Sequence, residues 1–206
     1  KDSLTFRTNF LKEAIDLPVT GKYNATNAMI AAYVALKEGV TEEAIQKAFL
    51  TLELTRNRTE WKKAKNGADI LSDVYNANPT AMRLILETFS TIPYNDNGRK
   101  LVVLADMKEL GADSKQMHGA MITSLNPDIL SEVFLYGEDM AALFAYAQEI
   151  FPPEKVHYFV KNADKDQFSD LVKAVKKALK PTDQVLIKGS NSMNLANLVE
   201  ELENEV

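Results

Sequence analysis

The sequence predicts an α/β protein whose larger part is a mostly parallel sheet with helices on both faces. The first observation is that, after residue 67, five apolar runs of strand length alternate with five segments of helical periodicity. The second is that β-then-α units in a row favour parallel pairing through right-handed crossovers. The third is a hydrophobic content of 46%, which is enough for a substantial core.

Residues 1–53 predict a small unit that is poor in strands. Small alanine side chains allow close packing of its first helix, Gly39 is placed to end that helix, and Thr41 can cap the next one. The unit is too small to be an independent domain, so we expect it to be the end of a larger α/β domain. Its predicted elements are a strand over 4–8, a strand end and turn over 17–21, and helices over 26–37 and 41–50.

Residues 54–206 predict the larger unit. It opens with a polar, charged connector over 55–67, which we interpret as a domain junction. The strands are predicted at 69–74, 100–105, 131–136, 156–160 and 184–188. The helices are predicted at 79–91, 113–125, 138–149, 165–180 and 191–203.

Composition excludes several classes of function. The net charge is −5 and no basic stripe is present, so nucleic acid is not an expected partner. There is no cysteine, which excludes disulfides, thiolate catalysis and cysteine-ligated zinc. No apolar run approaches the ~18 residues of a membrane helix. The chain starts without Met or a signal-peptide core, and we expect it to be a piece of a longer protein.

The segment 73–79, Asp-Val-Tyr-Asn-Ala-Asn-Pro, is the most informative motif. It follows a predicted strand and opens a predicted helix, the place where open α/β sheets bind ligands. Asn78 as the helix cap and Pro79 as the first helical residue fit an ordinary strand-to-helix turn. An ordinary turn does not explain why Asp73, Tyr75 and Asn76 gather at this position. From this segment alone, a functional site and a purely structural turn are about equally supported.

Two further groups precede this corner. Asn24 and Asn27 are three residues apart on a predicted helix, so both carboxamides could reach the edge of a purine. The plainer alternative is that Asn24 caps the helix and Asn27 is simply exposed. Arg58 could pair with phosphate through its forked donors, although a charged connector is usually only solvated.

Two further groups of candidate residues follow the 73–79 segment in the sequence. Asp106 and Glu109 come after a predicted strand and could act as general bases or metal ligands, but turn capping is favoured. Lys188 and Ser190 follow the last strand at a helix start and suit an anion, without the spacing of a P-loop. His118 fits a structural role better than a catalytic one.

These groups, in this order, resemble the Mur ligases of bacterial cell-wall synthesis, from about residue 17 to the end. The matching segments are GKYNATNAMIAA at 21–32, RTE at 58–60, DVYNANP at 73–79, VLADMKELG at 103–111 and LIKGSNS at 186–192. The third and fourth segments point to the branch of the family that adds D-alanyl-D-alanine to UDP-N-acetylmuramoyl-tripeptide.

The resemblance implies a Rossmann-like carboxyl-terminal ligase domain over 54–206, preceded by the end of a central ATP-binding domain over 1–53. It implies ATP and Mg²⁺ as cofactors, with metal ligands outside these residues, and a cytoplasmic, monomeric enzyme with no membrane or nucleic-acid partner. Arg58 would stabilise charge in catalysis. Nucleotide would be bound by Asn24, Asn27, Arg58, Asp73 and Tyr75, and substrate by Asn76, Asn78, Lys188 and Ser190.

Two alternatives remain open. The chain could be a nucleotide-binding module without chemistry, or part of a related ligase such as a folylpolyglutamate synthase. A glutamate-adding site should offer extra cations for a second carboxylate, and few cations lie near Asp73 in the sequence.

Overall fold

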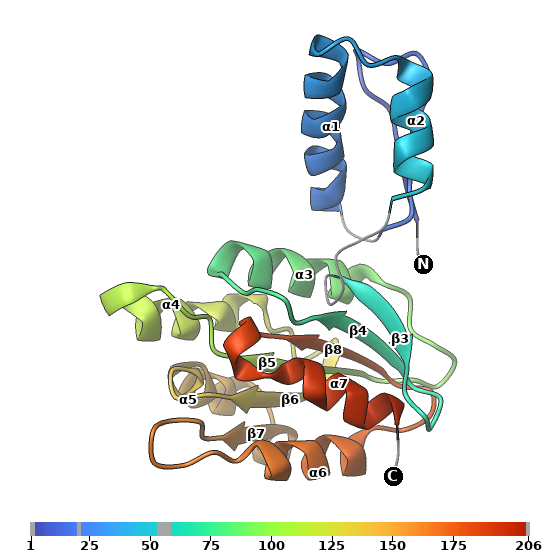
Figure 1. The fold of residues 1–206 in the computed structure, drawn as a ribbon. Coiled ribbons are helices and arrows are strands. Elements are labelled where there is room, and N and C mark those ends of the chain that lie inside the picture. The colour runs from blue at the N-terminus through green and yellow to red at the C-terminus, as the bar shows by residue number, and fades with distance from the viewer. Residues whose placement is uncertain (1–2, 20–21, 53–58, 205–206) are drawn as a thin grey trace. The chain divides into compact units, whose positions relative to one another are not determined.

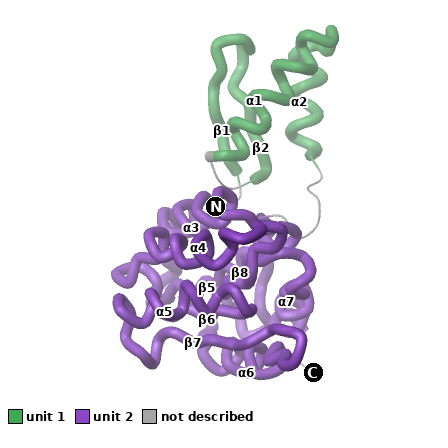
Figure 2. The backbone as a smooth tube through the Cα atoms, turned by 90° about the vertical axis from the view of Figure 1, so that its left-hand side faces the viewer, with its two compact units in different colours: residues 1–55 green, residues 56–206 purple. Residues whose placement is uncertain are grey.

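The computed structural model describes residues 3–19, 22–52 and 59–204. The chain divides into two compact units, Lys1–Thr55 and Arg56–Val206, which Figure 2 shows in different colours. The assignment of the first one to a central ATP-binding domain stays a prediction.

Unit 1 is a two-stranded antiparallel sheet with two helices. The strands are β1 (Leu4–Phe6) and β2 (Ile15–Leu17), and the helices are α1 (Lys22–Lys37) and α2 (Glu42–Leu50). The Thr41 hydroxyl accepts the Ala44 N–H at 3.3 Å, which confirms the predicted cap. The small core is built from buried residues of both helices, β2 and the loops: Leu11, Ile15, Leu17, Val19, Ala28, Ala32 and Ile45.

The outer face of α1 carries apolar side chains in solvent. Ile30 is 60% exposed, Val34 53% and Tyr33 49%. A helix that buries only small alanines on one side and shows large apolar groups on another is typical of an element that packs on two sides.

Unit 2 contains a six-stranded sheet in the order β3-β4-β8-β5-β6-β7. All neighbours are parallel except β3, which is antiparallel to β4. The predicted mostly parallel α/β sheet is therefore confirmed. The strands are β3 (Glu60–Lys63), β4 (Asp69–Asp73), β5 (Lys100–Ala105), β6 (Leu130–Tyr136), β7 (Val156–Phe159) and β8 (Gln184–Lys188).

Helices cover both faces of this sheet (Figure 1). One core joins the sheet to α3 (Pro79–Thr91) and α5 (Met140–Ile150), and the other joins it to α6 (Phe168–Ala178) and α7 (Leu195–Glu203). Helix α4 (Ser114–Ala120) contacts α5. No helix in the described part of the chain is long and apolar enough to cross a bilayer. Short 3₁₀ turns complete the unit: η1 (Gly111–Asp113), η2 (Met121–Ser124), η3 (Pro153–Lys155) and η4 (Asn191–Met193).

Several elements differ from the sequence predictions: α1 begins four residues earlier than predicted, α6 is shorter than the predicted 165–180, and three further differences have a clear local cause. The connector over 55–67 contains β3, an edge strand whose polar residues hide its extended character. The predicted helix over 113–125 is α4 flanked by η1 and η2, because apolar periodicity alone does not separate α from 3₁₀ turns. The last helix begins at Leu195 instead of residue 191, after η4 and a left-handed Asn194 with φ 58°.

Candidate functional site at the carboxyl edge of the sheet

The sheet order brings three of the sequence motifs together. Strand β8 lies between β4 and β5 and is parallel to both, so the carboxyl ends of these strands lie side by side. Asp73 ends β4, Lys188 ends β8, and Asp106 follows β5. The motifs are far apart in sequence, yet they meet at the edge where α/β sheets bind ligands.

Asp73 and Lys188 form an ion pair at this edge. They are register partners, and the Lys188 Nζ lies 2.6 Å from Asp73 Oδ2. The lysine side chain is 1% exposed and the aspartate 14%. The second aspartate oxygen accepts the Thr59 N–H at 3.3 Å. These two contacts fix the orientation of the Asp73 carboxylate, and little solvent reaches its charge.

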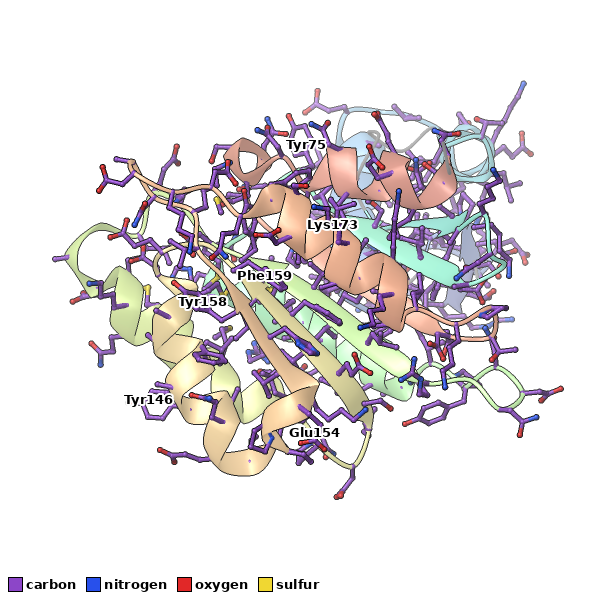
Figure 3. All side chains as sticks on the ribbon, turned by 90° about the horizontal axis from the view of Figure 1, so that it is seen from below. Tyr75, Tyr146, Glu154, Tyr158, Phe159 and Lys173 are labelled. Atoms are coloured by element: carbon purple, nitrogen blue, oxygen red, sulfur yellow. The ribbon has the colours of Figure 1, made fainter. Side chains whose placement is uncertain are left out.

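The turn before α3 presents polar groups. Asn78 caps α3, because its Oδ1 accepts the Ala81 N–H at 2.8 Å, and Pro79 is the first helical residue as predicted. Asn76 Oδ1 accepts the Ala77 N–H at 2.8 Å, while its carboxamide stays exposed. Tyr75, which is labelled in Figure 3, is 45% exposed. The helix N-terminus and two amides thus face solvent at one corner.

Asp106 is buried and not an exposed acid. It accepts hydrogen bonds from the loop after β6, and we call this set of contacts the Asp106 clamp. Its carboxylate is fully buried; Oδ1 accepts the Met140 N–H at 3.0 Å, and Oδ2 accepts the Glu138 N–H at 3.1 Å. The partly exposed Lys108 Nζ lies 2.8 Å from Oδ2. Asp106 therefore ties the loop after β5 to the loop after β6. A carboxylate with these partners has no lone pair exposed for proton abstraction.

Ser190 joins the loop after β8 to the Asp106 clamp. Its N–H donates to the Asp106 carbonyl at 3.1 Å, and its hydroxyl accepts the Lys108 N–H at 2.9 Å. The serine is buried. The loops after β5, β6 and β8 are thus one hydrogen-bonded assembly, with the Ser190 hydroxyl proton available to donate.

His118 is structural, as the sequence analysis favoured. It is fully buried on α4, and its Nδ1 lies 2.7 Å from the Ser114 carbonyl. Its Nε2 accepts the Met107 N–H at 2.8 Å. These partners define the neutral Nδ1–H tautomer. Glu109, the other candidate base, is exposed and has a left-handed backbone with φ 66°.

A partly buried phenol supports the loop after β6. The Tyr158 hydroxyl donates to the Gly137 carbonyl at 2.9 Å, and Figure 3 shows Tyr158 on β7 beside α5. Burial raises the pKa of Tyr158, and the negative charges of Asp106, Glu138 and Asp139 raise it further. The phenol therefore remains a neutral donor at physiological pH.

The two candidate asparagines of unit 1, Asn24 and Asn27, both lie on α1. This helix begins at Lys22, so Asn24 lies within its first turn and is not its cap. Asn24 is half-buried, Asn27 is exposed, and the i, i+3 spacing places them on one face of α1. Arg58 lies outside the described residues, so its predicted role stays a prediction.

The sequence analysis missed the clamp that surrounds Asp106. Gly137 directly follows β6 with φ 135°, and a side chain there would overlap the Asp106 carboxylate. A glycine immediately after a predicted strand was the available signal, but it does not identify its partner. Among residues 3–19, 22–52 and 59–204, no group of three His, Cys, Asp or Glu side chains could hold a metal ion.

Replacing Asp106 by Asn is expected to destabilise unit 2 by about 2 kcal/mol, because one of two buried N–H groups loses its acceptor. Urea unfolding followed by the fluorescence of Trp61, the only tryptophan, measures this. The control Lys108→Ala removes only an exposed partner and should cost less than about 1 kcal/mol. Equal effects of the two substitutions would contradict the clamp.

A mostly parallel sheet with amides, a phenol and an ion pair at its carboxyl edge defines a ligand-binding α/β domain. The profile of the family described as "Mur ligase, glutamate ligase domain" matches residues 57–191. The chain therefore belongs to the Mur ligase family.

Curated relatives agree with this family. The UDP-N-acetylmuramoyl-tripeptide–D-alanyl-D-alanine ligase of Bacillus subtilis (strain 168) is 30% identical over 197 residues, which are 96% of this chain and 41% of the relative. The chain thus spans about two fifths of the length of the curated relatives it matches.

Solved structures give the same fold. A crystal structure of MurF from Acinetobacter baumannii matches with a TM-score of 0.75 and 25% identity, over 98% of this chain and 42% of that one. MurF from Thermotoga maritima in complex with ADP matches with a TM-score of 0.69 and 22% identity, over 98% and 46%. Mycobacterium tuberculosis folylpolyglutamate synthase shares the fold more distantly, with a TM-score of 0.60 and 17% identity, over 96% and 48%.

Proposed function

We propose that this chain is part of an ATP-dependent ligase that adds D-alanyl-D-alanine to UDP-N-acetylmuramoyl-tripeptide. The observation that carries the proposal is the 73–79 corner. Its amides and phenol are exposed at a helix N-terminus, beside a held carboxylate, in a chain whose curated relatives bear this activity in their names. The apolar outer face of α1 supports the proposal that unit 1 is the end of a larger ATP-binding domain.

In the proposed reaction the terminal carboxylate of the tripeptide receives the γ-phosphoryl group of ATP, and ADP leaves. The free amine of D-alanyl-D-alanine then attacks the acyl carbon, and phosphate leaves as the peptide bond forms. The protein must position two anionic substrates and stabilise the charge of the tetrahedral intermediate. Magnesium would screen the phosphates when bound; the described residues offer no cluster to hold it.

The proposed roles divide between the units. Asn24 and Asn27 on α1 would contact adenine, Arg58 the phosphates, and Asp73 and Tyr75 the rest of the nucleotide. Asn76, Asn78 and Ser190 would bind the incoming dipeptide, since each can still donate a hydrogen bond after its contacts within the protein. Lys188, predicted from the sequence to bind substrate, already has two partners within the protein.

The direct test uses a full-length protein that contains this chain. With ATP and the UDP-muramoyl tripeptide, we expect ADP release and a new peptide bond with D-alanyl-D-alanine, and none with L-glutamate. Ligation of glutamate instead would favour the folylpolyglutamate synthase alternative. ATP binding without turnover of any amine would favour the non-catalytic module.

The chain by itself is expected to show no ATP turnover, because it has no GxxxxGK[ST] segment to cradle phosphates. Release of ADP by the purified chain, measured against its Arg58→Ala variant, tests this. Turnover that depends on Arg58 would show that the 206 residues hold a complete ATPase site, contrary to the proposal.

A further inference from the structure

Lys188 differs from the usual ligand for an anionic substrate. Its side chain is 1% exposed, and its Nζ already donates to Asp73 Oδ2 at 2.6 Å and to the Asn76 carbonyl at 2.9 Å. A lysine that binds an incoming carboxylate needs an accessible ammonium group. Here two of the three ammonium N–H groups already have partners and the side chain is almost fully covered, so a substrate carboxylate has little access to the third. Turning the ammonium toward a substrate would leave the Asp73 charge without its partner.

We propose that Lys188 is a positioning residue: it sets the Asp73 carboxylate and the turn before α3, and it does not bind the dipeptide carboxylate. This inference rests on the proposed function. The ammonium group bridges the end of β4 to the Asn76 carbonyl, three residues further along the chain. It therefore fixes the path of the backbone that carries Tyr75 and Asn76.

The same stretch of chain connects this turn to the Asp106 clamp. Two residues after Lys188, Ser190 donates its N–H to the Asp106 carbonyl and accepts the Lys108 N–H. Residues 188–190 thus hold the nucleotide-facing turn on one side and the loops after β5 and β6 on the other. Because a misplacement of ~1 Å can cost about 10²-fold in rate, the bridge matters for catalysis without touching substrate.

The test compares two dipeptides, D-alanyl-D-alanine and its carboxyl-terminal amide, in the full-length protein with and without Lys188→Met. For a positioning residue, kcat falls about 10²-fold, and the preference for the carboxylate over the amide is unchanged. Arginine in place of lysine restores part of kcat. If Lys188 binds the carboxylate, the preference disappears in Lys188→Met, and that result overturns the proposal.

Lys177→Met is the matched control, because Lys177 is exposed on α6. Should Lys188→Met not fold, the variant Asp73→Asn/Lys188→Met removes both charges and is used for the same comparison of the two dipeptides.

A second measurement uses the chain itself and does not depend on ligation. Lys188→Met should speed hydrogen exchange of the Thr59 amide, which donates to Asp73, at least tenfold. Unchanged exchange overturns the positioning role, whereas missing ligation by the unaltered protein overturns only the proposed function.

Discussion

Replacing Gly137 by Ala is expected to destabilise unit 2 by about 4 kcal/mol or more, a large share of the ~5–15 kcal/mol of a typical domain. Two causes act together. The backbone has φ 135°, which side chains rarely adopt, and the new Cβ would overlap the Asp106 carboxylate. The aspartate cannot move aside without abandoning the N–H groups of Glu138 and Met140. Urea unfolding followed by Trp61 fluorescence measures the loss.

Gly111→Ala provides the control for backbone strain alone. Gly111 also has a positive φ, 66°, but a Cβ there meets nothing within 4 Å. Its substitution should cost about 1 kcal/mol. If Gly137→Ala is no less stable than Gly111→Ala, the loop that carries Asp106 can move aside at little cost, contrary to the prediction. If the overlap is the main cause, Asp106→Ala and Gly137→Ala combined should cost clearly less than the sum of the two.

Replacing Arg58 by Ala in the full-length protein is expected to lower kcat about 10²- to 10³-fold, the usual cost of removing one preorganised charge-stabilising donor. Arg58→Lys should recover only part of the rate, because lysine keeps the charge but loses the forked geometry. The assay is ADP release with the tripeptide and dipeptide substrates.

Arg56→Ala, two residues away in the same charged segment, is the matched control and should leave kcat nearly unchanged. Equal losses at both arginines would point to a general effect of charge on substrate attraction. That effect weakens with added salt, whereas the loss at Arg58 should not. No loss at Arg58 would remove it from the catalytic groups.

The strongest sequence signals predicted the central strands. The bounds of β5, β8 and α3 agree with the sequence predictions, because uninterrupted apolar runs and the Asn78–Pro79 start signal are local properties. The edge strand β3 was missed, because only one of its faces packs on the core and its residues are mostly charged. Edge strands of this kind carry little apolar periodicity.

The candidate site shows the same limit. That Asp73, Asp106 and Lys188 each follow a strand could be predicted, since each motif is contiguous. Their contacts could not, because the order β4-β8-β5 places β8 between two strands that lie about 80 and 115 residues earlier in the chain. The Lys188–Asp73 pair is a product of that order, and no spacing in the sequence indicates it.

The first strand and the last helix of unit 2 touch each other. Lys62 of β3 pairs with Glu203 of α7 at 2.9 Å, and the Lys65 N–H donates to the Leu202 carbonyl at 2.9 Å. A unit whose ends meet can be cut elsewhere and rejoined through a short linker without changing its interior. Circular permutation at an exposed loop, such as the one around Asn97, should therefore preserve the sheet and its carboxyl edge, and would let this unit be spliced as an insert into another host protein.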